Sequence, residues 1–268
     1  MSSTERFLPP EIASLIAIDL KPTPRLGAMS SGLPSLVQLF SAAAMEGDKD
    51  IALILNGLAR ATKVAFPGSK FGSHGFQSLS RHFECLTELN LSDCDSVTST
   101  MIQEALCSCH NLEVIDADFI QVKDVVGGRP WVCLSLRELK VCFLFHGLEN
   151  DLQPLVFERL SRLTQLETLE VGYAKRRLVP HVEEGLVFRL HSGLAALAIL
   201  KRLKFVDVYN LRLVLGANEL EWMKTNWTSL VSISGEVFIE PGVRGKVEFD
   251  FFVSDRKAPS IIDILEAE

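Results

Sequence analysis

The sequence lacks the features that mark membrane proteins and general nucleic-acid-binding proteins. Its 268 residues contain no apolar run as long as the roughly 18 residues that a membrane span needs. Its 27 basic and 34 acidic residues give a formal net charge of −7, whereas nucleic-acid binding needs clustered Lys and Arg. The first ten residues are polar and end in prolines, so no apolar core of a signal peptide is present. We therefore expect no nucleic acid and no membrane among its partners, and an intracellular location, cytoplasmic or nuclear.

Catalytic and metal-binding motifs are also missing. The chain has no G-x-S-x-G elbow, no phosphate-binding P-loop and no H-E-x-x-H pair, and its six histidines are scattered along the sequence. Cys107, Cys109 and His110 form half of a metal clip, but a second clip is absent. We predict a protein without enzymatic activity, cofactor or metal, in which the six cysteines are structural.

What the sequence does contain is a recurring apolar phrase with the form apolar-x-x-apolar-x-x-apolar-x-apolar. It is clearest at Phe83, Leu86, Leu89 and Leu91. Of 32 phrase positions, 30 are apolar, against about 15 expected for a chain that is 47% apolar. The eight phrases are Leu33, Leu36, Leu39, Ser41; Leu58, Ala61, Val64, Phe66; Phe83, Leu86, Leu89, Leu91; Cys109, Leu112, Ile115, Ala117; Cys133, Leu136, Leu139, Val141; Leu163, Leu166, Leu169, Val171; Leu197, Leu200, Leu203, Phe205; and Trp227, Leu230, Ile233, Gly235.

The spacing of the phrases predicts one strand and one returning helix in each unit. A period in the twenties is typical of such units, and stacking them buries a continuous core. In the third unit, Leu89 and Leu91 alternate with polar residues as in a strand buried on one face. Thr98 or Ser99 can cap the helix that follows. Later steps are longer, which predicts insertions around His146–Pro154 and around Gly172–Gly185; the second contains Lys175-Arg176-Arg177.

The third unit resembles the repeat of a known family. The stretch from Cys85 to Leu112 resembles the cysteine-containing leucine-rich repeat of F-box leucine-rich-repeat proteins and ribonuclease-inhibitor-like horseshoes, and the whole chain is similar to fungal members of that group. The resemblance implies an α/β solenoid with parallel strands on the concave face and helices on the convex face. It also implies a non-catalytic protein–protein interaction module that recognises substrates in an F-box/cullin ubiquitin ligase pathway, with the ligase adaptor as a further partner. A structural or inhibitory repeat protein without a ubiquitin link is the alternative.

The two ends of the chain have different expected roles. Residues 7–16 resemble only the opening of an F-box, and Pro22 and Pro24 break any helix before the first phrase, so a complete F-box is not evident. We expect a cap or an F-box remnant in residues 1–32, a repeat domain of about eight units in 33–240, and a C-terminal cap strand and helix in 241–268. In that last segment Val247, Phe249, Phe251 and Val253 alternate as in a strand, and the helix after Pro259 is either a cap or a docking helix.

The residues between the buried strand positions face the predicted concave side. The middle units are acidic there and a late unit is basic, so we predict a protein ligand of basic character at the centre; ordinary solvated strand residues are the alternative. The candidate protein-binding residues are Glu88, Asn90, Asp116, Asp118, Glu138, Lys140, Glu170, Arg202 and Lys204.

Overall fold

A computed structural model describes residues 36–38, 47–146, 149–172, 185–239 and 252–254. Nine strands form one sheet in which every strand pairs in parallel with the next strand along the chain, in the order β1 to β9. The strands are β1 (Leu36–Gln38), β2 (Lys63–Ala65), β3 (Glu88–Asn90), β4 (Val114–Gln121), β5 (Glu138–Leu144), β6 (Thr168–Glu170), β7 (Phe205–Leu215), β8 (Ser232–Ile239) and β9 (Phe252–Ser254).

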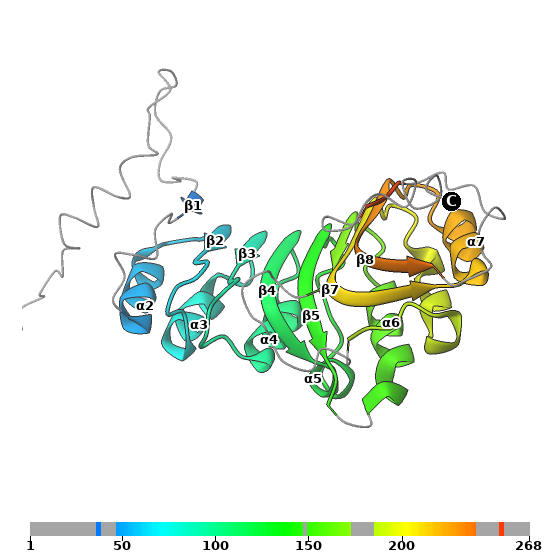
Figure 1. Cartoon of the computed structure of the whole chain (residues 1–268). Helices are drawn as coiled ribbons and strands as arrows, with labels where there is room; N and C mark the ends of the chain where they lie inside the picture. Colours follow the sequence, from blue (N-terminus) through cyan, green and yellow to red (C-terminus); the bar gives the residue numbers. More distant parts are fainter. Residues whose placement is uncertain (1–35, 39–46, 147–148, 173–184, 240–251, 255–268) are drawn as a thin grey trace, which may run out of the picture.

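Helices connect most of the strands. The helices are α2 (Asp48–Gly57), α3 (Ser73–Leu79), η2 (Ser80–His82), α4 (Ser99–Ser108), α5 (Val122–Gly127), η3 (Glu149–Leu152), α6 (Gln153–Ser161), η4 (Leu190–Ser192), η5 (Leu194–Ile199) and α7 (Ala217–Asn226). Figure 1 shows the strands side by side in a row, with α2, α3, α4 and α5 along one side of it. Sequential parallel strands with returning helices make this an α/β leucine-rich-repeat solenoid, which confirms the predicted fold class.

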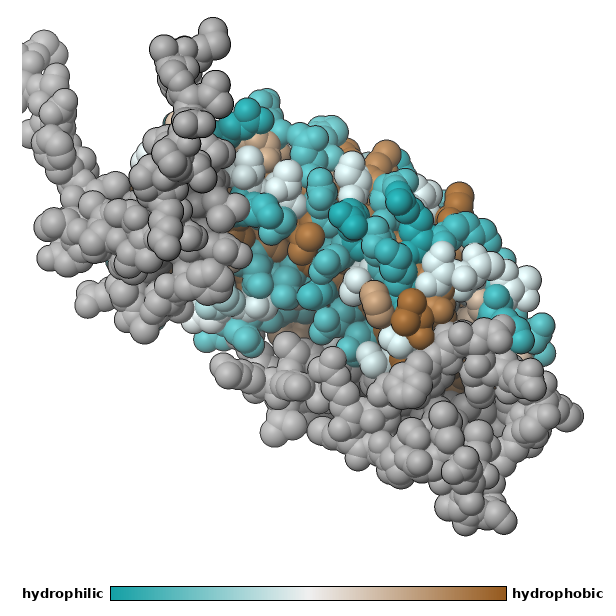
Figure 2. All heavy atoms as spheres, turned by 90° about the horizontal axis from the view of Figure 1, so that it is seen from above, coloured by the Kyte–Doolittle hydropathy of each residue, from teal (hydrophilic) through white to brown (hydrophobic). Residues whose placement is uncertain are grey.

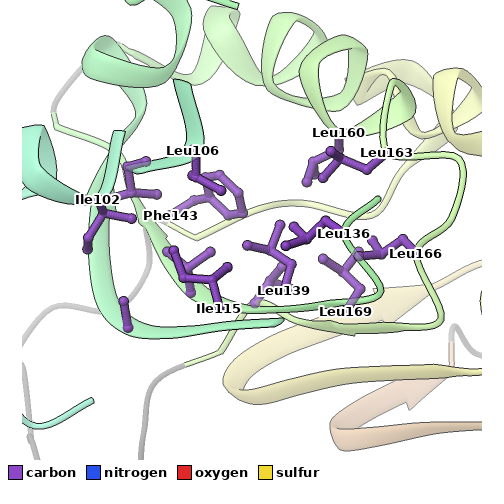
Figure 3. Close-up of a cluster of buried hydrophobic side chains, with 14 of the residues drawn as sticks. Ile102, Leu106, Ile115, Leu136, Leu139, Phe143, Leu160, Leu163, Leu166 and Leu169 are labelled. Atoms are coloured by element: carbon purple, nitrogen blue, oxygen red, sulfur yellow. The ribbon is translucent and has the colours of Figure 1, made fainter. Parts of the chain in front are cut away.

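The third unit forms for the reasons that its sequence indicates. Thr98 has an extended backbone, and its side chain accepts the backbone N–H of Met101, so it caps α4 as predicted. The helix buries Ile102 and Leu106. Figure 3 shows these two side chains above Ile115 of β4, within the core that the strands and helices share.

The strand register confirms the predicted phrases in the second to sixth units and in the eighth. The central residues of successive strands are paired, and each of those with a described side chain is almost fully buried. This buried column consists of Val64, Leu89, Ile115, Leu139, Leu169, Val206 and Ile233. One apolar core therefore continues through all these units.

The predicted register of the seventh phrase is wrong by three residues. Leu169 pairs with Val206, not with Leu203, and Phe205 is 43% exposed although it was expected to be buried. The buried phrase is Leu200, Leu203, Val206 and Val208. The error has a physical cause: η5 buries Leu197, and the three-residue spacing of a 3-10 helix continues the spacing of the phrase toward the N-terminus.

The first predicted phrase is shifted as well. Val37 pairs with Val64, the position that had been expected for Leu39. Because side chains alternate along a strand, this two-residue shift keeps the same set of residues on each face. Leu33, Leu39 and Ser41 lie outside the described residues.

Two pairs of strands continue beyond the repeat and bend. The β4–β5 register shifts between Asp116 and Phe119, and the β7–β8 register shifts between Val208 and Arg212. These longer strands are visible near the middle and at the right of Figure 1. Bulges of this kind interrupt the regular alternation of side chains, and in β4 the alternation of buried residues continues to Asp118 and breaks at Phe119.

The predicted insertions and end segments are only partly described. The first insertion contains η3 and the first residues of α6, which follows η3 directly. β9 pairs Val253 with Ile233, as expected for a final strand. Residues 1–32, Lys175-Arg176-Arg177, Val247 to Phe251 and the predicted C-terminal helix lie outside the described residues, and the domain boundaries remain predictions.

Candidate functional site

The outward side chains of the strands form two rows across the sheet, which we call the sheet face. Each row follows directly from the paired register, because residues that flank a buried strand position point to the opposite side. The first row is Lys63, Glu88, Val114, Glu138, Thr168, Phe205 and Ser232. The second row is Ala65, Asn90, Asp116, Lys140, Glu170, Asp207 and Ser234. Asp118 follows Asp116 on the same side of β4.

The sheet face carries a clear excess of negative charge. Two lysines, Lys63 and Lys140, stand against six carboxylates, which leaves a formal charge of four negative. The carboxylates are those of Glu88, Asp116, Asp118, Glu138, Glu170 and Asp207. The excess is larger than the sequence predicts, because the late unit contributes an aspartate where basic residues were expected.

Both lysines of the sheet face are in contact with its carboxylates. Lys63 forms an ion pair with Glu88 across neighbouring strands. Lys140 Nζ lies 3.7 Å from Glu138 Oε2 on the same strand. The negative charge is therefore concentrated from β4 toward β7, where Lys140 is the one lysine of the two rows.

A small pocket opens on the sheet face at the bend of β4. Its lining includes four predicted site residues, Asp116, Asp118, Lys140 and Glu170. Its volume of about 30 Å³ has room for about two water molecules. Sites for small organic ligands are about ten times larger, so this pocket does not fit a metabolite.

Electrostatics in the pocket are shaped by burial. Burial raises the pKa of the Asp116 carboxyl, and the nearby Lys140 ammonium partly opposes that rise. Burial also raises the pKa of Asp118, although the backbone N–H of Asp93 donates to Asp118 Oδ1 at 2.9 Å. Asp93 has a left-handed backbone with φ of 59°, which aims this N–H at Asp118.

Arg202 and Lys204 do not belong to the sheet face. The buried phrase begins three residues later than predicted, so both residues precede the first residue of β7 and lie outside the two rows. Lys204 Nζ lies 2.7 Å from Glu167 Oε2, and Arg202 donates to Gln165. Glu167 also pairs with Arg137 at 3.0 Å, and hydrogen bonds from Lys204 and Arg137 hold the pKa of its carboxyl below the usual value. In the predicted basic unit, Lys204 is thus held in an ion pair with Glu167, and Arg202 is held by a hydrogen bond to the neutral side chain of Gln165.

Sequence reasoning missed Phe205 and Asp207 as sheet-face residues. They flank Val206 on β7 and continue the two rows after Thr168 and Glu170. The signal that could have identified them is the alternation of Val206 and Val208, which is the pattern of a strand buried on one face.

The cysteines pack in the core and bond to the backbone. All six are free and buried. Cys94 Sγ donates to Phe66 O at 3.0 Å, and burial raises the pKa of Cys109 and Cys133 to about 12. Thiols with such pKa values are poor nucleophiles and poor metal ligands at neutral pH.

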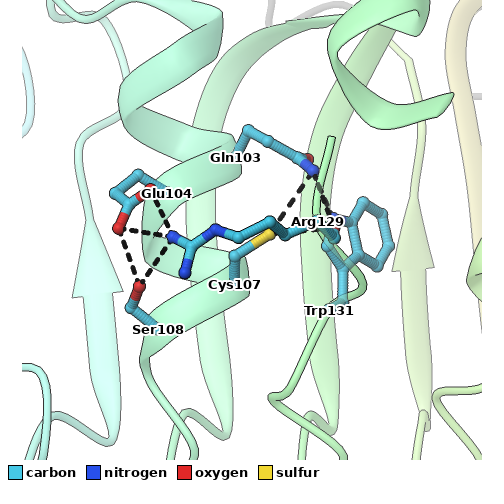
Figure 4. Close-up of polar contacts among 6 residues, drawn as sticks. All are labelled: Gln103, Glu104, Cys107, Ser108, Arg129 and Trp131. Atoms are coloured by element: carbon cyan, nitrogen blue, oxygen red, sulfur yellow. Dashed lines mark hydrogen bonds and ion pairs between the residues drawn. The ribbon is translucent and has the colours of Figure 1, made fainter. Parts of the chain in front are cut away.

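Cys107 belongs to a buried polar network rather than to a metal clip. Its Sγ donates to Arg129 O at 3.1 Å, and Gln103 bridges the same carbonyl and the indole N–H of Trp131. Figure 4 shows these residues together with the Arg129–Glu104 ion pair. In the part of the chain that the structure describes, no three His, Cys, Asp or Glu side chains are placed to hold a metal ion.

On the face seen from above in Figure 2, hydrophilic residues predominate in the coloured region and apolar residues form small groups. None of the described helices is long and apolar enough to cross a membrane.

Comparisons with known proteins add little to this geometry. The chain matches no protein-family model and no curated protein. Among solved structures it is similar to an internalin from Listeria monocytogenes, with 13% sequence identity, a TM-score of 0.34, and coverage of 76% of this chain and 68% of the internalin chain. The fold assignment therefore rests on the nine-strand register of the chain itself.

Proposed function

We propose that this protein is a non-catalytic binding module that holds a protein partner of basic character on its sheet face. The observation that supports this best is the row of carboxylates on a side of the sheet where α2 to α5 do not pack. A face of one sign attracts partners of the opposite sign and sets the orientation in which they dock. Of the nine predicted binding residues, the seven on β3 to β6 carry this proposal.

Binding rather than chemistry fits the character of the pocket. The carboxyls of Asp116 and Asp118 line a space of about 30 Å³, which is much smaller than the sites that hold small organic ligands. A docked protein needs no such space, because its side chains lie across the open rows. Standard protein interfaces bury about 800 Å² on each partner, which requires several neighbouring strands to act together.

The test is reversal of three carboxylates on adjacent strands. The variant Glu88→Lys, Asp116→Lys and Glu138→Lys is compared with wild type in affinity capture from the native host, with captured proteins identified and their binding repeated in purified form. We expect loss of the captured partner. A control that reverses Glu84, Glu158 and Glu221, all exposed and outside the sheet face, makes the same change in net charge and is expected to retain it. Unchanged recovery with the sheet-face variant contradicts the proposal.

A link to ubiquitin ligases is a finer proposal that rests on the sequence resemblance. The phrase from Phe7 to Ile12 and the cysteine-containing repeat at Cys85–Leu112 support it. Its test is direct binding of the first forty residues to the ligase adaptor. Binding supports substrate recognition in that pathway, and failure to bind favours the alternative, a repeat protein that acts by covering its partner.

A further inference from the structure

The corrected register of β7 gives the acidic sheet face an apolar neighbour. Phe205 is 43% exposed and lies between Thr168 and Ser232 in the first row. Large apolar side chains exposed beside a charged surface are typical of the centre of a protein-binding site.

Asp207 lies beside Phe205 on the same side of the strand. Two residues along a strand span about 6.6 Å, so both side chains can contact one docked segment. Asp207 is also paired with Glu170 across the sheet, at a strand spacing of about 4.8 Å. Like charges at paired positions destabilise a sheet, and a cation bound from outside removes that repulsion.

One oxygen of Asp207 has an unmet capacity to accept a hydrogen bond. Asp207 Oδ1 is buried and has no hydrogen-bond partner among the described residues. Buried carboxylate oxygens are hydrogen-bonded in nearly all proteins. The described residues therefore leave the Asp207 carboxylate incompletely satisfied, and a turn of its side chain would bring it to a donor on a partner. Lys204, the nearest basic residue in sequence with a described contact, is engaged by Glu167.

We propose that Phe205 and Asp207 together anchor an extended segment of the protein partner that carries an arginine or lysine two residues from a bulky apolar side chain. This deepens the proposed function and rests on it. Residues two apart in an extended segment lie on one side about 6.6 Å apart, which matches the separation of Phe205 and Asp207. The cation donates to Asp207 beside the negative charge of Glu170, and the apolar side chain packs on Phe205.

The test uses the full chain and a synthetic peptide as probe. The peptide has eight residues, is acetylated, and alternates leucine and arginine with threonine, so that each leucine lies two residues from an arginine. Fluorescence anisotropy measures its Kd. A second peptide replaces arginine with neutral citrulline, and a third places leucine and arginine next to each other. We expect both to bind at least fivefold more weakly than the first.

Single variants then locate the contact. Asp207→Asn is expected to weaken the first peptide about tenfold, and Phe205→Thr, which keeps a strand-forming residue, at least threefold. Glu158→Gln and Leu155→Ser on α6 are the matched controls, since Leu155 is also 43% exposed, and each should change Kd less than twofold.

Three results overturn the inference: no measurable peptide binding, equal binding of the citrulline peptide, or wild-type affinity in both β7 variants. These are distinct from failure of the proposed function. If the triple reversal on β3 to β5 abolishes partner capture while the β7 variants retain wild-type affinity, the sheet face binds a partner but this anchor is wrong.

Discussion

The carboxylate of Asp48, at the start of α2, accepts the backbone N–H of Gly75 in the next helix at 2.8 Å. It also accepts the N–H groups of Gly72 and His74, each at 2.8 Å. The first N–H groups of a helix have no partner within that helix, so one side chain satisfies the start of α3 from the neighbouring unit. Asp48 thus links two units through the backbone and not only through the apolar core.

Replacing Asp48 should weaken this link measurably. Asp48→Ala leaves three N–H groups without their acceptor, and we expect a loss of roughly 2 kcal/mol in the free energy of unfolding. Urea denaturation at pH 7 measures it. Asp50→Ala in the same helix turn removes an exposed carboxylate and should change the free energy by less than about 0.5 kcal/mol. Equal effects of the two substitutions contradict the capping role.

The contribution of Asp48 should depend on pH. Burial alone raises the pKa of its carboxyl, but hydrogen bonds from Gly75, His74 and Gly72 outweigh it and hold the pKa below the usual value of 3.8. A lowered folded-state pKa gives stability that is present above 3.8 and is lost as the pH falls through the folded value. The stability difference between wild type and Asp48→Asn should therefore shrink as the pH falls below 3.8. A difference that stays constant over that range contradicts the prediction.

Glu219 should stabilise the unit that precedes β8. It is 7% exposed and accepts the N–H groups of Leu190 and Gly216 at 3.2 and 3.1 Å, with Arg189 at 3.2 Å. Burial raises the pKa of Glu219, yet the hydrogen bond from Leu190 and the other donors bring it below the usual value. We expect Glu219→Gln to lower the free energy of unfolding by about 1.5–3 kcal/mol.

Glu221→Gln is the control for Glu219, because Glu221 is exposed on the same helix. Thermal unfolding of the two variants at pH 7 compares them directly. A shift in Tm for Glu219→Gln that is no larger than that for Glu221→Gln contradicts a structural role for the buried carboxylate.

Gly193 should tolerate alanine less well than Gly68. Both glycines have positive φ, 102° and 66°. A Cβ at Gly193 would lie 2.7 Å from the Cα of Pro154, whereas the space at Gly68 is open. We expect Gly68→Ala to cost about 1–2 kcal/mol from the left-handed backbone alone and Gly193→Ala to cost more. Chemical denaturation of both variants tests the order, and the reverse order contradicts it.

The sequence was sufficient to predict the repeat because its signal is local. Leu86, Leu89 and Leu91 alternate within one short strand, and burial on one face makes such alternation obligatory. The same local pattern gave a wrong prediction at Phe205. The short 3-10 helix η5 also buries residues three apart, so the predicted phrase began inside that helix and its strand positions were assigned three residues too early.

That shift also explains which site residues were predicted. Glu88, Asn90 and Asp116 lie in units with a correct register and were placed on the sheet face, whereas Asp207 was missed with its strand. The capping by Asp48 could not be predicted, because its partners lie 24 to 27 residues away and meet it only after the units stack.

The sequential order of the nine strands has a consequence for how this protein comes apart. Within the described residues, every sheet contact joins units that are adjacent along the chain, and no strand pairing joins the first unit to the last. Local unfolding can begin at either end of the sheet and stop at the boundary between any two units. The strands β4 to β7 lie in the middle, so they keep a neighbouring strand on both sides for longest. Amide hydrogens in these central strands should exchange most slowly. A partner docked there would stabilise the part of the molecule that already unfolds last.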